Sequence, residues 1–129
     1  MATGFPASTG DVLTSSMFNG LTSFTIGTAN TSDYTAVSAD QYQVLEIMNK
    51  ATAIAFKIPT NASVAFPVGT AITVLNIGAG TCTISAVTSG TTTVLSAGAT
   101  PASPTLAQYK SAVCIKTATD TWYVVGGIA

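Results

Sequence analysis

Residues 71–87 read AITVLNIGAGTCTISAV, and this stretch decides the fold class. Two runs rich in Val, Ile and Thr flank Gly78-Ala79-Gly80, which is typical of two short β-strands with a tight connection. We interpret the glycine segment as a hairpin turn, because it opens no helix of the kind that a phosphate-binding loop requires. Residues 72–77 are apolar on both faces of the predicted strand, which favours burial on two sides.

The same pattern continues on both sides of this stretch. Short runs rich in β-formers begin about every 10 to 15 residues, the rhythm of a sandwich or barrel. The predicted strands are residues 43–48, 53–58, 71–77, 81–87, 92–96, 109–117 and 121–125. Residues 88–105 predict a hairpin and then a surface loop, with a 3₁₀ turn at 105–107. The sequence therefore predicts an all-β protein, a compact antiparallel β-sandwich or barrel of about seven to eight short strands.

In two of these runs, the alternation of residue types indicates which side chains share a face of the predicted strand. Ile54, Phe56 and Ile58 share one face of their strand, and Lys57 lies on the other. In residues 111–116, Val113 and Ile115 face one way and Lys116 the other way.

The last strand is apolar on both faces. Trp122 and Val124 alternate with Tyr123 and Val125. We expect one of these faces to lie in the core and the other at a subunit contact. Two doubly apolar strands are difficult to cover within one small domain, which favours oligomerisation.

Residues 1–23 differ from the β region, residues 24–129, and we interpret them as an N-terminal arm. Residues 11–21 predict one or two helical turns, with Thr14 as the N-cap and Asn19-Gly20 as the end. A turn of this length is not stable alone, so it must dock on its own domain or on a partner. The predicted interface residues are Phe5, Leu13, Met17, Phe18 and Leu21 in the arm, and Tyr123 and Val125 in the last strand.

Composition points away from several classes of function. The chain has no His, 7% charged residues and 47% hydrophobic residues, and its formal net charge is −1. Its four cations, all lysines, are too few and too dispersed for a nucleic-acid-binding protein. No apolar run is long enough to span a membrane, and the first residues do not form a secretory signal. Weak self-repulsion and a mean hydropathy of +0.50 favour association with other protein.

We find no catalytic constellation, so the chain is not predicted to be an enzyme, and no catalytic, cofactor or metal residue is assigned. Serine nucleophiles lack a His base, and the acidic residues do not cluster along the sequence. These acids are Asp11, Asp33, Asp40, Glu46 and Asp120. Four aromatic residues suit a sugar-binding platform as an alternative to core or interface packing: Tyr34, Tyr109, Trp122 and Tyr123.

Cys82 and Cys114 are the only cysteines, and they have no metal-binding spacing. We interpret them as small buried hydrophobic residues. A disulfide between them stays open as an alternative, because it depends on whether their strands are neighbours.

Two segments carry a resemblance to a known family. Residues 10–19, GDVLTSSMFN, resemble the GDVLTAxxMN segment near the start of many tailed-bacteriophage fibre and virion proteins. Residues 58–70, with 72–74, 78–80, 108–109, 115–116 and 119–122, are similar to a small β domain of phage tail fibres and head-decoration proteins. This second resemblance covers residues 24–127. The chain lacks the Arg that sometimes precedes the Gln108-Tyr109 position, and it has no long shaft or repeat.

The resemblance implies a compact β fold, a homotrimer and assembly in the bacterial cytoplasm. Because the chain is short, we expect a capsid decoration (cement) protein on the virion surface, with the major capsid protein as its partner. The alternative is a receptor-binding or structural module of a tail fibre or spike, with other tail proteins and a host surface glycan as partners. Neither interpretation involves nucleic acid, a membrane or a cofactor.

Overall fold

The structure is a computed structural model that describes residues 23–96 and 103–128, and almost all of its regular elements are strands. The one helical element of these residues is the 3₁₀ helix η1 (Ser38–Gln41). The ten strands of the described residues are β1 (Thr25–Ile26), β2 (Tyr34–Thr35), β3 (Val44–Met48), β4 (Ile54–Ile58), β5 (Ala71–Asn76), β6 (Cys82–Ala86), β7 (Thr93–Leu95), β8 (Thr105–Leu106), β9 (Lys110–Ala118) and β10 (Thr121–Gly126). The predicted all-β class is confirmed.

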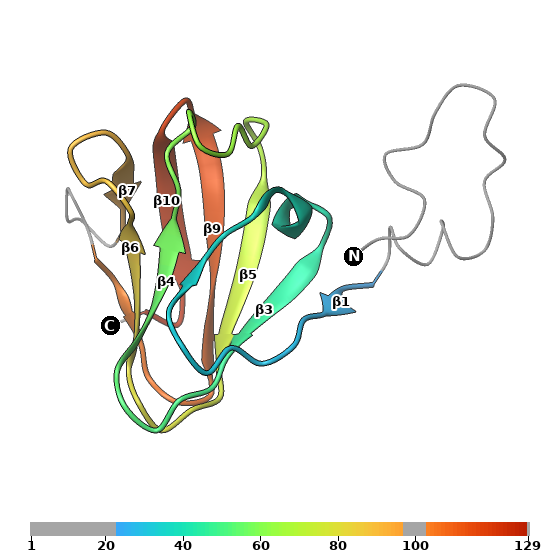
Figure 1. Ribbon diagram of the computed structural model, residues 1–129, viewed down its shortest axis with the longest axis vertical. Helices are drawn as coiled ribbons and strands as arrows, with labels where there is room; N and C mark the ends of the chain where they lie inside the picture. Colours follow the sequence, from blue (N-terminus) through green and yellow to red (C-terminus); the bar gives the residue numbers. More distant parts are fainter. Residues whose placement is uncertain (1–22, 97–102, 129) are drawn as a thin grey trace, which may run out of the picture.

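The strands form two mixed sheets. One sheet has the order β1-β3-β5-β9-β10-β7 and the other has the order β2-β4-β6-β8. From β1 to β8, consecutive strands alternate between the two sheets, and five of the pairs join strands that are next but one along the chain, as β3 is to β5 and β4 to β6. Figure 1 shows this alternation, with β4 lying in front of the larger sheet.

The antiparallel pairing that the sequence predicted is wrong for most of the molecule. Five of the eight strand pairs in the described residues are parallel. In four of these parallel pairs, β1 with β3, β2 with β4, β3 with β5 and β4 with β6, the chain crosses to the other sheet and back and so returns in its original direction. Antiparallel pairing occurs where β9 meets β5 and β10, and where β8 meets β6.

The connection at residues 77–81 is an arch between the two sheets, so the predicted hairpin is wrong. It rests on the equivalent connection after β3: Gly80 N donates to Lys50 O (2.9 Å). The buried Asn76 ties the arch to β8, because its Nδ2 donates to Gly80 O and to Leu106 O, both at 2.9 Å. A Cβ atom at Gly80 would overlap the backbone of Thr52, so only glycine permits this stacking.

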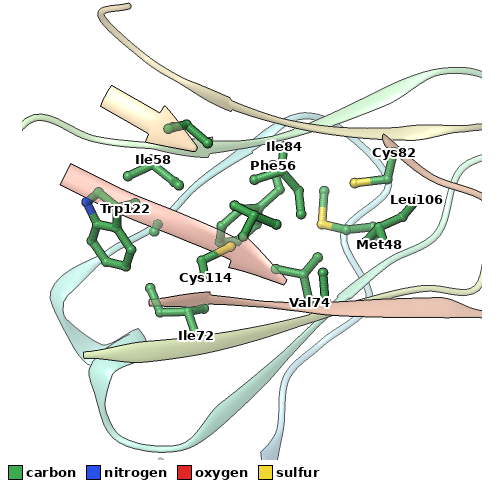
Figure 2. Close-up of a cluster of buried hydrophobic side chains, with 14 of the residues drawn as sticks. Met48, Phe56, Ile58, Ile72, Val74, Cys82, Ile84, Leu106, Cys114 and Trp122 are labelled. Carbon is green, nitrogen blue, oxygen red and sulfur yellow. The ribbon is translucent and has the colours of Figure 1, made fainter. Parts of the chain in front are cut away.

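Inward-facing side chains from both sheets meet in one core (Figure 2). Ile54, Phe56 and Ile58 lie in it, as the alternation predicted. The Trp122 ring is 1% exposed and packs edge to face on Phe66, with 5.5 Å between ring centroids. Burial of these side chains is the main stabilising term of the fold.

Four short elements were not predicted. Strands β1, β2 and β8 contain two residues each, and a pattern of period two is not detectable over that length. Strand β8 replaces the predicted 3₁₀ turn, and η1 was missed. Strand β7 was predicted at the right place but as part of a hairpin, whereas it pairs in parallel with β10. The helical turns predicted within residues 11–21 lie outside the described residues.

Candidate self-assembly surface

The outer face of the six-stranded sheet is apolar. Every second residue of its strands points away from the core, and these outward positions are either aliphatic, aromatic, Ala or hydroxyl side chains. The larger apolar members are Ile26, Leu45, Ile47, Leu75, Leu95, Val113, Ile115, Tyr123 and Val125. We call this set the outer apolar face. Its size and composition make it the candidate functional site.

Strand register arranges these residues in continuous rows across the sheet. One row crosses five strands from Ile26 through Leu45, Thr73 and Val113 to Val125. Residues opposite each other on neighbouring strands have Cβ atoms about 4.5–5.5 Å apart, so the row is one contiguous surface.

A second row lies beside the first. It runs from Ala71 through Ile115 and Tyr123 to Leu95. Six strands spaced about 4.8 Å apart and about five residues long give a face of about 400 Å². A patch of this size is comparable to the largest apolar patches on soluble monomers, which are often functional.

The two sheets differ sharply in what they present outward. No outward position in the described strands of the six-stranded sheet carries a charge. The four-stranded sheet presents Ala55 and a polar set instead, namely Thr35, Lys57, Thr83, Ser85 and Thr105. Lys57 there forms an exposed ion pair with Asp33 (3.9 Å). One side of the molecule is therefore suited to water and the other to protein.

Two of the predicted interface residues lie on the outer apolar face. Tyr123 is 44% and Val125 49% exposed, whereas Trp122 and Val124 on the same strand are buried. The other five, Phe5, Leu13, Met17, Phe18 and Leu21, lie outside the described residues. Val113 and Ile115 on β9 were predicted to share a face but were not assigned to an interface. The outward residues of β3 and β7 were not predicted, although their period-two alternation was the signal that could have found them.

The alternation predicted for β9 is confirmed, but Lys116 is the residue that faces inward. Its side chain is 2% exposed, and its Nζ donates to Asn61 Oδ1 (2.6 Å) and Phe66 O (2.7 Å). The small inward neighbours Ala112 and Cys114 give no hint of this burial.

Asp120 completes this polar group. Its Oδ1 accepts hydrogen bonds from Asn61 N (2.7 Å) and Thr92 Oγ1 (3.1 Å). Asp120, in the turn between β9 and β10, therefore binds a backbone amide 59 residues away in the sequence. All of these polar atoms are used in holding the connection after β4 against β9 and β10, which is a structural role.

We expect Lys116→Met to lower the free energy of unfolding by about 2–3 kcal/mol, since it removes the donor from the buried Phe66 O and from the part-buried Asn61 Oδ1. Urea unfolding followed by the fluorescence of Trp122, the only tryptophan, measures the change. Lys110→Met, at an exposed position, is the matched control. Equal unfolding midpoints for the two variants would contradict the bracing role.

The aromatic residues considered for a sugar platform do not form one. Trp122 is enclosed in the core, and the Tyr34 ring stacks on Phe56 with 5.9 Å between ring centroids. Tyr123 belongs to the outer apolar face, and Tyr109 lies 76% exposed between β8 and β9.

Both thiols are free and buried, Cys82 on β6 and Cys114 on β9. Burial raises the pKa of Cys82 to about 11 and that of Cys114 to about 12. Both therefore stay protonated at neutral pH, consistent with their prediction as small hydrophobic residues. Among residues 23–96 and 103–128, no group of three or more His, Cys, Asp or Glu side chains could hold a metal ion.

Comparison with known proteins gives no relative. No family model matches the chain, no curated protein matches it, and no solved structure matches its fold. The part of the chain that the structure describes has no helix of the length and apolarity needed to cross a membrane.

Proposed function

We propose that this protein is a non-enzymatic structural protein of a tailed-bacteriophage virion, a homotrimeric decoration (cement) protein that stabilises the head shell. In this proposal its two sheets form a β-sandwich, and it is assembled in the cytoplasm of the host bacterium. The outer apolar face is the observation that carries self-association. The virion setting and the number of three copies rest on the resemblance of residues 10–19 and 24–127 to phage virion proteins.

Self-association follows from the cost of leaving the outer apolar face in water. Each 100 Å² of apolar surface buried contributes about 2.5 kcal/mol. Because the face carries no charge at its outward strand positions, its burial against another copy requires no ion to be desolvated. Identical copies that cover this face for one another leave the hydroxyl-rich sheet in water.

In this proposal the protein strengthens the head shell because its binding favours the assembled state of the shell. A subunit that binds only the assembled shell stabilises it by a free energy that grows with the logarithm of the ratio of subunit concentration to dissociation constant. In this proposal the arm, residues 1–23, contacts the major capsid protein or a neighbouring subunit. The shell then resists the pressure of packaged DNA through many small interfaces.

A tail-fibre or spike module is the second candidate function, and Tyr109 is the observation that favours it. This residue has a positive φ of 66° and is 76% exposed. Non-glycine residues in that region of φ occur preferentially at functional sites. An exposed aromatic ring held in this way suits a host surface glycan.

Binding assays separate the two candidates. We expect the purified trimer to bind expanded empty capsids and not host cells, and the protein to occur in hundreds of copies per virion. A tail protein would bind host cells and occur in only a few copies per virion. Quantitative mass spectrometry of purified virions gives the copy number. A count near the number of tail fibres, together with cell binding lost in Tyr109→Ala, would replace the first candidate by the second.

A further inference from the structure

A chain of polar side chains crosses the open edge between the two sheets. It contains Tyr34 on β2, Asp40 on η1, Glu46 on β3, and Asn30, which precedes β2. Asp40 is 2% exposed and Glu46 is 5% exposed. Strand β2 belongs to the four-stranded sheet and β3 to the six-stranded sheet, so these residues connect the two layers.

Each carboxyl group has its own set of donors. Tyr34 Oη and Val37 N both donate to Asp40 Oδ2, at 2.8 and 2.9 Å. Asn30 Nδ2 donates to Glu46 Oε2 (3.2 Å). The two carboxyl groups also lie within reach of each other, and a hydrogen bond between them requires a proton on one of them.

No cation balances the pair in the described part of the chain. The strands packed beside Glu46, β1 and β5, contain no ionisable side chain, and η1 contributes only Asp40. On β2 the ionisable group is Tyr34, and burial raises the pKa of its phenol, so it stays a donor. Lys57 on β4 points outward from the four-stranded sheet and pairs with Asp33.

Burial and the adjacent Asp40 carboxyl raise the pKa of Glu46 to about 7. Two buried carboxylates without a cation are costly, so one of them keeps its proton to a higher pH than in water. The proton on Glu46 then forms the hydrogen bond to Asp40.

We propose that Glu46 and Asp40, joined by this proton, form a pH-dependent latch that closes the edge between the two sheets and opens above neutral pH. While Glu46 is protonated, the hydrogen bonds run without a break from β3 through Asp40 to β2. Loss of the proton places two negative charges against each other and pushes η1 and β2 away from β3. The segment that opens comprises residues 25–41, which include the edge strand β1.

The sign of the effect follows from proton binding. The unfolded chain loses the Glu46 proton near pH 4.5, and the folded chain loses it near pH 7. Between these values the folded state binds more protons, so stability falls as the pH rises and becomes constant above the folded value.

Glu46 is the only glutamate in the sequence, so ¹³C labelling of glutamate gives one side-chain carboxyl signal. We expect this signal in the native protein to titrate with a midpoint near pH 7. A midpoint at or below pH 5 would overturn the proposal without recourse to any variant.

Hydrogen exchange, corrected for the intrinsic effect of pH, tests the opening. We expect the amides of Gly27, Asn30 and Ala36, which all donate to backbone carbonyls, to lose protection about tenfold between pH 6 and 8. The amide of Lys116 in the six-stranded sheet is expected to keep its protection. Uniform loss at all four amides would show global destabilisation and would overturn the latch.

Glu46→Gln gives the matched variant. The Gln amide can donate to Asp40 permanently, so we expect protection of residues 25–41 that does not change between pH 6 and 8. Asp33→Asn, which removes an exposed carboxyl outside the cluster, is expected to keep the wild-type profile. If protection in Asp33→Asn were as independent of pH as in Glu46→Gln, the assignment of the effect to Glu46 would be contradicted. If Glu46→Gln does not fold, the carboxyl titration and the hydrogen exchange of the wild-type protein decide.

Discussion

Replacing Gly80 with Ala is expected to lower the free energy of unfolding by about 3 kcal/mol or more, and the melting temperature by about 10 °C. Gly80 lies where the arch after β5 rests on the connection after β3, with its amide bonded to Lys50 O. The added methyl group would overlap the carbonyl of Thr52. Backbone cannot move aside as a flexible side chain can, so the stacked arches must separate and the two sheets with them.

Gly90→Ala is the control for this change, because a Cβ atom there meets nothing within 4 Å and the backbone is not in the left-handed region. Thermal unfolding of both variants at one protein concentration isolates the effect of the arch. A Gly80→Ala protein as stable as Gly90→Ala would show that the two connections are not stacked as described.

Replacing Val113 with Glu is expected to abolish self-association. Val113 lies in the middle of the longest row of the outer apolar face, between Thr73 and Val125. In an assembly each copy brings the same carboxylate into the interface, where an unpaired buried charge costs about 3–5 kcal/mol. Since about 1.4 kcal/mol is a factor of ten, the dissociation constant rises at least a hundredfold.

Thr83→Glu places the same charge at a half-buried outward position of the other sheet. It is expected to leave the oligomer intact. Sedimentation velocity at micromolar concentration, with circular dichroism to confirm that both variants fold, makes the comparison. Dissociation of both variants, or of neither, would count against the outer apolar face as the interface.

The strands could be predicted from the sequence because their signal is local. Alternation in residues 53–58 and the double apolar pattern of residues 121–125 both correspond to what the side chains meet in the structure. Pairing could not be predicted, because a strand followed by a glycine-rich connection looks the same whether the chain turns back or crosses to another sheet. The difference lies in long-range contacts, such as that of Asn76 with Leu106.

The candidate surface was predicted by name only through Tyr123 and Val125, which lie exposed on its strand β10. Apart from the exposed Ile26, its other large apolar residues are each half-buried, and they form one surface only because strand register aligns them across the sheet. The buried polar residues were missed for a related reason. Lys116 meets Asn61, and Glu46 meets Asp40, through folding of the chain, and composition alone treats each as an exposed charge.

The central claim is that copies of this chain cover the outer apolar face for one another. Native mass spectrometry of the purified full-length protein at micromolar concentration tests it most directly. We expect a trimer that persists on tenfold dilution and is lost in Val113→Glu. A monodisperse monomer of 12.9 kDa across this range would contradict the account.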